Sequence, residues 1–207
     1  MKCSKEQGIM RKTIAVAVAL CAFGCFGEVE IRPGTVEVVL SEKPLPVVQF
    51  AADELTNFLS RALGKAVPVV TAPTPGKMSI VVGTNVWSEV AGIDVGKLPR
   101  DGFVVKSAHG RIFIAGRDMD GPFNPAKDWK GGEKATLFGV YDFLERYVGC
   151  RFYFPGEIGE VVPRVNSFTV PEGEYAEAPE FIERKVRYSL GEWFEPVSKA
   201  QYEMNGR

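Results

Sequence analysis

The sequence predicts an α+β protein in which two main helices pack on a mixed β-sheet. Two amphipathic segments carry apolar residues at helical spacing, and each ends at a glycine that leads into an apolar extended run. Short β-branched runs separated by Pro and Gly predict the strands. Because both helices are followed by a buried strand in the same way, we expect them to lie on one face of a single sheet.

The first part of the chain is expected to hold one long helix, one short helical turn and most of the sheet. Pro46 suits the first helical position, and Gly64 supplies the stop after Leu63. Residues 87–91 predict the short turn. Apolar extended runs predict strands over residues 36–40, 67–71, 78–83, 102–107 and 111–115. The last two form a hairpin, since Gly110 can adopt the positive φ that a tight turn requires.

The second part begins with a long polar loop over residues 117–132, rich in Gly, Pro and Asp. Apolar residues from Leu137 to Val148 predict the second helix, which Gly149 ends. Short strands are expected over residues 151–154 and 167–170. Residues 172–179 are acidic and extended, which we interpret as a linker.

The amino terminus has the layout of a secretory signal. An uncharged apolar run over residues 14–23 follows a basic start and precedes small residues, and it is too short to span a bilayer. We expect a signal peptide over residues 1–27, with translation starting at Met1 or Met10. The protein would then be exported to the periplasm or the extracellular space. A lipoprotein anchored through Cys25 is the alternative, although the sequence before Cys25 departs from the usual lipoprotein pattern.

The composition excludes several classes of function. About 180 residues remain after the leader, enough for one domain of ordinary size. The net charge is −1 with acids and bases intermixed, so the basic footprint of a nucleic-acid binder is missing. Cys150 is the only cysteine clear of the leader, which leaves too few ligands for a zinc cluster. No nucleotide-binding glycine motif occurs, and we expect neither a cofactor nor a metal.

Candidate catalytic groups are few. The single histidine, His109, falls in the predicted hairpin turn, where a structural role is the simpler interpretation. Asp53 and Glu54 are adjacent on a helix and point apart. Glu157 and Glu160 lie three apart between glycines and could face one substrate as glycosidases require, but a turn that docks on a neighbouring domain explains them better.

One loop concentrates oxygen ligands suited to calcium, but its spacing does not match an EF-hand. The ligands are Asp118, Asp120, Asn124 and Asp128. Loop and tail aromatics could stack on sugar rings, and Trp129 is the candidate sugar contact, whereas burial in an interface is the more usual role of such side chains.

Five segments in a fixed order carry a resemblance to a known family. They are AADELTNFLSRALG, VPVV, IVVGT, DGFVVKSAHGRIFIAG and TLFGVYDFLERYVGCRFYFPGEIGEVVP. This order resembles the amino-terminal domain of bacterial proteins with domain of unknown function 4838. It is also similar to the matching domain of alpha-glucuronidases of glycoside hydrolase family 67 and, more distantly, of beta-hexosaminidases.

The resemblance implies a domain over residues 28–175 that precedes a catalytic (β/α)₈ barrel. Residues 176–207 would be a linker and the start of that barrel region. A barrel needs about 250 residues, so it would be missing from this chain, which then looks like a fragment. The loop over residues 117–132 looks longer than in the family.

The implied function is that of a non-catalytic accessory domain of a secreted glycoside hydrolase-like protein that degrades polysaccharide. The expected docking surface for the barrel is Arg151, Tyr153, Phe154, Pro155 and Glu157. A free-standing carbohydrate-binding module that uses Trp129 remains the alternative. An independent hydrolase using Glu157 and Glu160 is a third possibility, and no complete active site is evident.

Overall fold

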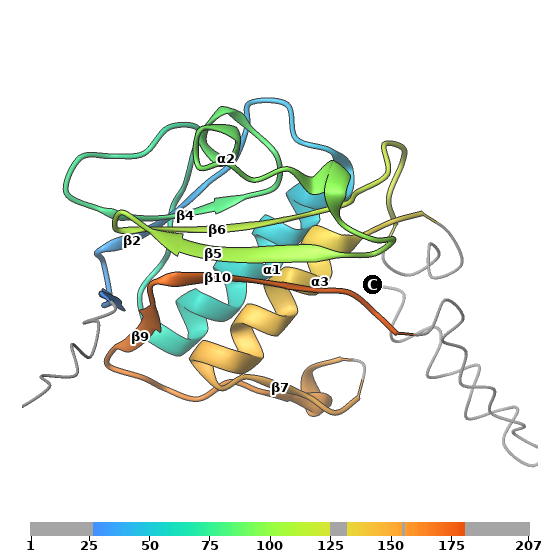
Figure 1. Ribbon diagram of the computed structural model, residues 1–207. Coiled ribbons are helices and arrows are strands. Elements are labelled where there is room, and N and C mark those ends of the chain that lie inside the picture. The colour runs from blue at the N-terminus through green and yellow to red at the C-terminus, as the bar shows by residue number, and fades with distance from the viewer. Residues whose placement is uncertain (1–26, 125–131, 155, 181–207) are drawn as a thin grey trace, which may run out of the picture.

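The computed structural model describes residues 27–124, 132–154 and 156–180, which are built around a six-stranded mixed sheet (Figure 1). The strand order is β10-β5-β6-β4-β2-β3. The strands are β2 (Val36–Val39), β3 (Val69–Val70), β4 (Met78–Val82), β5 (Phe103–Ala108), β6 (Arg111–Gly116) and β10 (Gly173–Glu177). From β3 to β6 neighbours run parallel, whereas β5 is antiparallel to both β6 and β10. The predicted α+β class is confirmed.

Two helices cover the same face of this sheet, as predicted (Figure 1). Helix α1 (Pro46–Leu63) has the predicted bounds, and Gly64 ends it with φ of 68°. Helix α3 (Ala135–Phe143) continues into a π-helical turn, η3 (Leu144–Val148), before Gly149 ends it with φ of 86°. Glycine suits both stops because L-residues with a Cβ adopt positive φ only at a cost.

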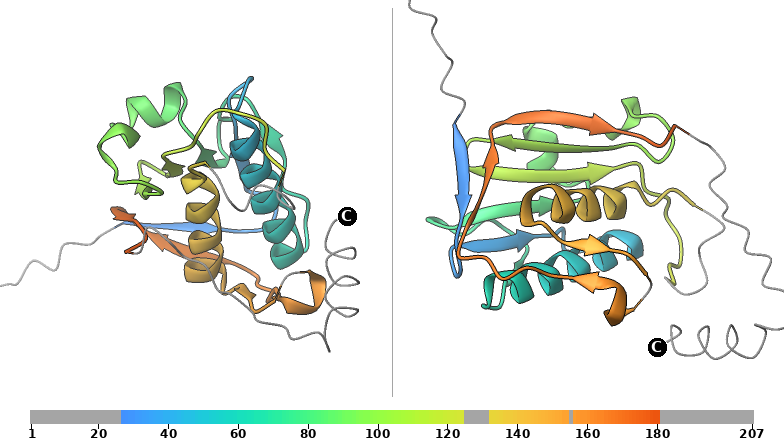
Figure 2. Two further views of the ribbon diagram at one scale, coloured as in Figure 1. Left: turned by 90° about the vertical axis from the view of Figure 1, so that its right-hand side faces the viewer. Right: turned by 90° about the horizontal axis from the view of Figure 1, so that it is seen from below.

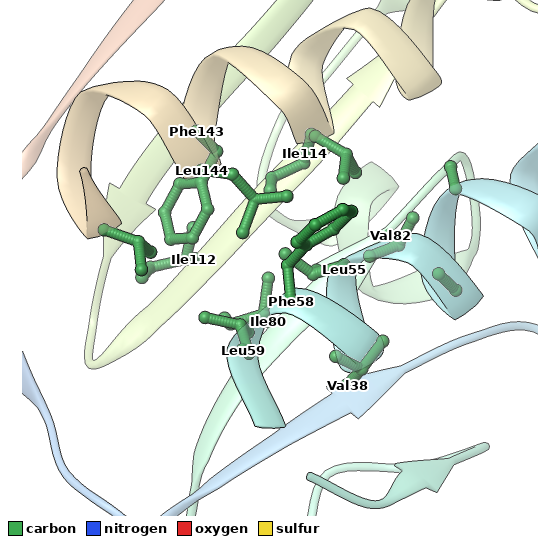
Figure 3. Packing of buried hydrophobic residues seen from close by; sticks show 14 of the residues in the cluster. Val38, Leu55, Phe58, Leu59, Ile80, Val82, Ile112, Ile114, Phe143 and Leu144 are labelled. Atoms are coloured by element: carbon green, nitrogen blue, oxygen red, sulfur yellow. The ribbon is translucent and has the colours of Figure 1, made fainter. Parts of the chain in front are cut away.

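The main core lies between these helices and the sheet (Figure 3). Leu55, Phe58 and Leu59 of α1 point toward the strands, and Phe143 and Leu144 do so from the second helical segment. The sheet contributes β-branched side chains that are almost wholly buried: Val38, Ile80, Val82, Ile112 and Ile114. This burial of apolar area supplies most of the driving force for folding.

The opposite face of the sheet is covered by the segment that contains α2 (Val86–Val90) and the short 3₁₀ turn η1 (Val95–Lys97) (Figure 1). A smaller cluster of Val39, Val81 and Phe113 packs there against Trp87. Asn85 begins α2 with a capping box, because its side chain accepts from the backbone of the first turn while Ser88 bonds back to its N–H.

Two small antiparallel sheets complete the fold. β1 (Glu28–Ile31) pairs with β9 (Phe168–Pro171), and β7 (Arg151–Phe152) pairs with β8 (Glu160–Val161) after a short 3₁₀ turn, η4 (Glu157–Gly159). The strands predicted over residues 67–71 and 151–154 correspond to β3 and β7, which are only two residues long each. β1 was not predicted.

The interpretation of residues 172–179 as a linker is wrong. Gly173–Glu177 form β10, an edge strand of the main sheet, which runs across the expected domain boundary after Tyr175. The charges do not prevent strand formation, because Glu174 pairs with Lys106 of β5 at 2.8 Å and Glu177 pairs with Arg146 at 2.5 Å.

The predicted signal peptide, except for its last residue, and residues 181–207 lie outside the described residues. Among the helices that the structure describes, none combines the length and the apolar character needed to cross a bilayer.

Candidate functional site

The hairpin formed by β7, η4 and β8 lies on the far side of the helix layer from the main sheet (Figure 1). Its turn is fixed by backbone contacts. The N–H of Tyr153 donates to the carbonyl of Gly159 at 2.9 Å, and a Cβ at position 159 would overlap the backbone of Phe154. Glycine is therefore required at this position.

The hairpin is anchored to both helices. The ring of Phe152 makes edge contacts with Phe58 of α1, at a centroid distance of 5.0 Å, and with Tyr141 of α3, at 4.9 Å. Arg61 pairs with Glu160 at 2.6 Å and stacks on Phe58 at 5.0 Å. Aromatic pairs of this kind contribute about 0.5–1.5 kcal/mol each beyond the area that they bury, so these contacts attach β7 to both helices.

Four large apolar side chains of this hairpin face solvent. The exposed fractions are 66% for Tyr153, 70% for Phe154, 98% for Ile158 and 49% for Val161. We call these four residues the hairpin surface. Clustered apolar exposure on a stable element is typical of an interaction site, whereas single exposed apolar residues are common.

The predicted docking residues fall on the same hairpin, although no observation tests their role. Tyr153 and Phe154 belong to the hairpin surface, and Arg151 and Glu157 are exposed beside it. The Nη1 of Arg151 also donates to the backbone carbonyl of Cys150 at 2.6 Å, which fixes its direction. Pro155 lies outside the described residues.

Three of the four candidate catalytic carboxylates, Asp53, Glu54 and Glu160, have structural partners. Glu160 is held by Arg61, whereas Glu157 lies exposed at the start of η4. On α1, Asp53 accepts from Gln49 at 2.9 Å. His109 takes φ of 52° in the hairpin turn.

Glu54 of α1 accepts a hydrogen bond from the Tyr141 hydroxyl at 2.6 Å, which ties the two helices together. Burial, together with the neighbouring Glu54, raises the pKa of the Tyr141 hydroxyl well above its ordinary value. Tyr141 therefore stays a neutral hydrogen-bond donor at physiological pH.

Asp118, the first of the predicted calcium ligands, caps helix α3. Its two carboxylate oxygens accept from the Thr136 N–H at 3.0 Å and the Thr136 hydroxyl at 2.5 Å. Burial raises the pKa of Asp118 from its ordinary 3.8 to about 6, despite these stabilising hydrogen bonds. Of the other candidate ligands, Asp128 lies outside the described residues. Within the described ranges, no cluster of three or more His, Cys, Asp or Glu side chains could hold a metal.

Trp129, the candidate sugar contact, lies outside the described residues. A pocket of about 260 Å³ is found where the chain flanks that segment, and Met119, Phe123 and Lys134 are among its lining residues.

Cys150 is buried, and this burial raises the pKa of its thiol to about 11, so the reactive thiolate is scarce at neutral pH.

Two features of the site were missed by sequence reasoning. Ile158 and Val161 were not predicted to face solvent. The cluster around Arg146 was not predicted either. Arg146 pairs with Asp142 of α3 and Glu177 of β10 and stacks on Tyr175 at 4.4 Å. The i,i+4 spacing of Asp142 and Arg146 was the one sequence signal for this cluster.

The fold and the hairpin define a compact α+β domain that carries an exposed apolar surface. Residues 30–123 match the family model described as "Glycosyl hydrolase family 67 N-terminus". The predicted similarity to the amino-terminal domain of alpha-glucuronidases of glycoside hydrolase family 67 is thereby confirmed over these residues. The similarity to proteins with domain of unknown function 4838 stays a prediction.

Two solved structures are similar to the chain. One is described as a family GH115 4-O-methyl-alpha-glucuronidase with specificity for decorated arabinogalactans; the TM-score is 0.47 at 17% identity, covering 72% of this chain and 18% of that one. The other is a GH20 beta-N-acetylhexosaminidase from Streptomyces coelicolor A3(2), with a TM-score of 0.48 at 16% identity, covering 75% of this chain and 24% of that one. The chain thus spans about a quarter or less of the length of either protein. No curated protein matches the chain.

Proposed function

We propose that this chain is the non-catalytic, accessory amino-terminal domain of an exported glycoside hydrolase-like protein that degrades polysaccharide. The observation that carries the proposal is the match of residues 30–123 to a domain described as the amino terminus of a glycosyl hydrolase family. The domain orients or stabilises a catalytic (β/α)₈ barrel that follows it, and the hairpin provides the contact.

The chemistry of the candidate residues supports an accessory role. Glycosidic hydrolysis requires two carboxyl groups at the substrate, about 5–9 Å apart, with one available as an acid. Glu160 is engaged by Arg61, and Glu54 is engaged by Tyr141, so both carboxylates serve the packing of the domain. The exposed Glu157 has an apolar neighbour, Ile158, which suits an interface better than a hydrophilic substrate cleft.

Export is part of the same proposal. The basic start and the apolar run over residues 14–23 are the features of a secretory signal. Cleavage after Gly27 would leave Glu28, the first residue of β1, as the new terminus. Mass spectrometry of the protein recovered from the periplasm or medium identifies the terminus, and a diacylglyceryl Cys25 would reveal lipidation.

Activity assays test the accessory role. The purified chain is incubated with aryl α-glucuronides and aryl β-N-acetylhexosaminides, and we expect no turnover above the buffer rate. If the reading frame continues in the DNA beyond the codon for Arg207, the longer polypeptide is expressed and assayed alongside, and it should contain the catalytic activity. Turnover by the short chain at an enzymatic rate, lost in Glu157→Gln or Glu160→Gln, would show that it is a hydrolase itself.

Docking and sugar binding are separated by two further measurements. In the longer polypeptide, Arg151→Ala and Tyr153→Ala should lower the melting temperature, while Val90→Ala on α2 serves as the exposed control; no change in the first two would contradict docking. Calorimetry of the short chain with oligosaccharides tests the alternative. Millimolar or tighter binding that is lost in Trp129→Ala but kept in Phe154→Ala would favour a carbohydrate-binding module.

A further inference from the structure

A second pocket of the domain contains no residue of the hairpin and is not used by the proposed docking role. It lies between β5, η3 and the turn that leads from β9 into β10, and Figure 2 shows how sharply the chain bends at that turn. Its volume is about 190 Å³. We call it the Ser107 pocket, after the residue of β5 that lines it.

The Ser107 pocket has a polar group in its lining that lacks a partner. Ser107 is only 4% exposed, and its hydroxyl oxygen makes no hydrogen bond with any group that the structure describes. Buried hydroxyls normally have a partner, because losing water is unfavourable for a hydroxyl when nothing replaces it. Ser79, a buried serine on the opposite face of the sheet, follows this rule and donates to Glu37 at 3.1 Å. The exception at Ser107 therefore indicates a group that is available to a ligand.

The neighbours of Ser107 leave room beside it. In the strand register Ser107 stands opposite Gly173 of β10, and a Cβ added at Gly173 would meet no atom within 4 Å. Tyr147 of η3 and Tyr175 of β10 line the same space, and both are partly buried. Tyr175 is held in place because its hydroxyl donates to Asp142 at 2.6 Å. The pocket is thus formed before a ligand arrives, as in most small-molecule sites.

The charges of the lining select an uncharged ligand. Both charged residues that line the pocket, Glu172 and Glu174, are acidic, and this disfavours an anion. Lys106 already supplies a positive charge to Glu174, at 2.8 Å, so a cationic ligand would compete with an existing ion pair. The unpartnered group is a neutral hydroxyl, which both donates and accepts hydrogen bonds.

The size and the apolar part of the lining suit a single sugar ring. An apolar cavity of about 150 Å³ holds a benzene ring, so the Ser107 pocket has room for one six-membered ring. Val105 and Val170 line it together with the two tyrosines. Sugar rings combine hydroxyl groups with an apolar C–H face that packs on aromatic side chains, and the lining offers a partner to each of these two parts.

We propose that the Ser107 pocket binds one pyranose unit of an uncharged polysaccharide, with the Ser107 hydroxyl bonded to a sugar hydroxyl and the ring packed on Tyr147 or Tyr175. The choice of a sugar among uncharged hydroxyl compounds rests on the proposed function. The lining contains neither Trp129 nor a hairpin residue, so this site is separate from both earlier candidates. Binding here would raise the local concentration of polysaccharide at the catalytic domain that follows.

An NMR titration of the whole chain tests the pocket. The probes are the methyl β-D-glycosides of glucose, galactose and xylose, and the readout is the amide signals of Ser107, Gly173 and Tyr175. We expect at least one of these neutral glycosides to shift the three signals with a millimolar dissociation constant. Methyl β-D-glucuronide, which replaces the hydroxymethyl group of the glucoside by a carboxylate, should bind several-fold more weakly than the glucoside because Glu172 and Glu174 repel it.

Two serine variants separate binding from folding. Ser107→Ala should weaken sugar binding about two- to tenfold, the range expected for the loss of one neutral hydrogen bond. It should leave the melting temperature unchanged or raise it, because the hydroxyl that it removes has no partner within the described structure. Ser79→Ala is the matched control on the other face of the sheet. It should lower the melting temperature, because Glu37 loses a donor, and bind the sugar as the wild type does.

Several outcomes would overturn the inference. The signals of Ser107, Gly173 and Tyr175 may stay unmoved with all three neutral glycosides, or Ser107→Ala may bind as tightly as the wild type. Shifts confined to residues around Met119 and Lys134 would assign the sugar to the other pocket, and tighter binding of the glucuronide would make the site an anion site. None of these results bears on the proposed accessory function, which the activity assays test separately.

Discussion

The carboxyl group of Asp118 should make the stability of this domain depend on pH in an unusual direction. Its pKa is raised from 3.8 to about 6, mainly by burial, so the folded protein holds this proton more tightly than the unfolded chain does. A group of this kind contributes stability that is fully present below pH 3.8 and is lost as the pH rises through about 6. Most carboxylates in ion pairs act in the opposite direction.

The size of the effect follows from the shift. One pKa unit corresponds to about 1.4 kcal/mol. The shift from 3.8 to about 6 therefore means that ionisation of Asp118 lowers the free energy of unfolding by at most about 3 kcal/mol. Asp118→Asn removes the titration, while the amide oxygen can still accept from the Thr136 N–H. Relative to wild type, the variant should therefore gain stability between pH 4 and pH 6.5.

Urea unfolding at half-unit steps of pH measures this gain. The altered hydrogen bond to Thr136 costs about 1 kcal/mol at every pH, so it shifts the difference between variant and wild type by a constant and does not change its slope against pH. Asp94→Asn is the control, because Asp94 is exposed and its pKa is lowered from the ordinary 3.8 by Lys97 and the Gly96 N–H. Its difference should slope the other way near and below that value and be flat as the pH rises toward 6. A flat difference for Asp118→Asn, or one that falls with rising pH, would refute the reasoning.

Three further predictions follow from the packing. Leu55→Ala should lower the free energy of unfolding by about 2–5 kcal/mol because the side chain is fully buried; chemical denaturation checks this, with Val90→Ala expected to stay within about 0.5 kcal/mol. Gly159→Ala should open the hairpin and speed proteolysis there, whereas an unchanged cleavage rate would contradict the close approach to Phe154. Arg146→Ala should increase hydrogen exchange in β10 while costing at most about 1 kcal/mol overall, since the ion pairs are partly exposed.

The sequence predicted the elements whose signal is local. The bounds of α1 came from Pro46, Gly64 and a helical repeat of apolar residues, and the structure places them as predicted. The hairpin between β5 and β6 was found from Gly110, although His109 also takes positive φ there. Periodicity and turn residues act within a few positions, and they were sufficient for these elements.

Elements that depend on distant partners were missed. β10 looked like a linker because its sequence is acidic, yet Lys106 and Arg146, 68 and 31 residues away from Glu174 and Glu177, balance two of its charges. The π-helical turn η3 likewise has no local sequence signal. Tertiary context overrides propensity in both cases.

The hairpin shows where the same limit falls on function. The sequence predicted a strand over residues 151–154 after the second helix, and the docking role of Tyr153 and Phe154 stays a prediction. Neither β8 nor the exposure of Ile158 was predicted, because an isoleucine is ordinarily assigned to the core. Here the core beneath the hairpin is already filled by Phe152, which takes the space between α1 and α3. Ile158 is not part of these contacts and is 98% exposed. The contacts that place β7 join residues that are far apart in the sequence, so local sequence patterns do not report them.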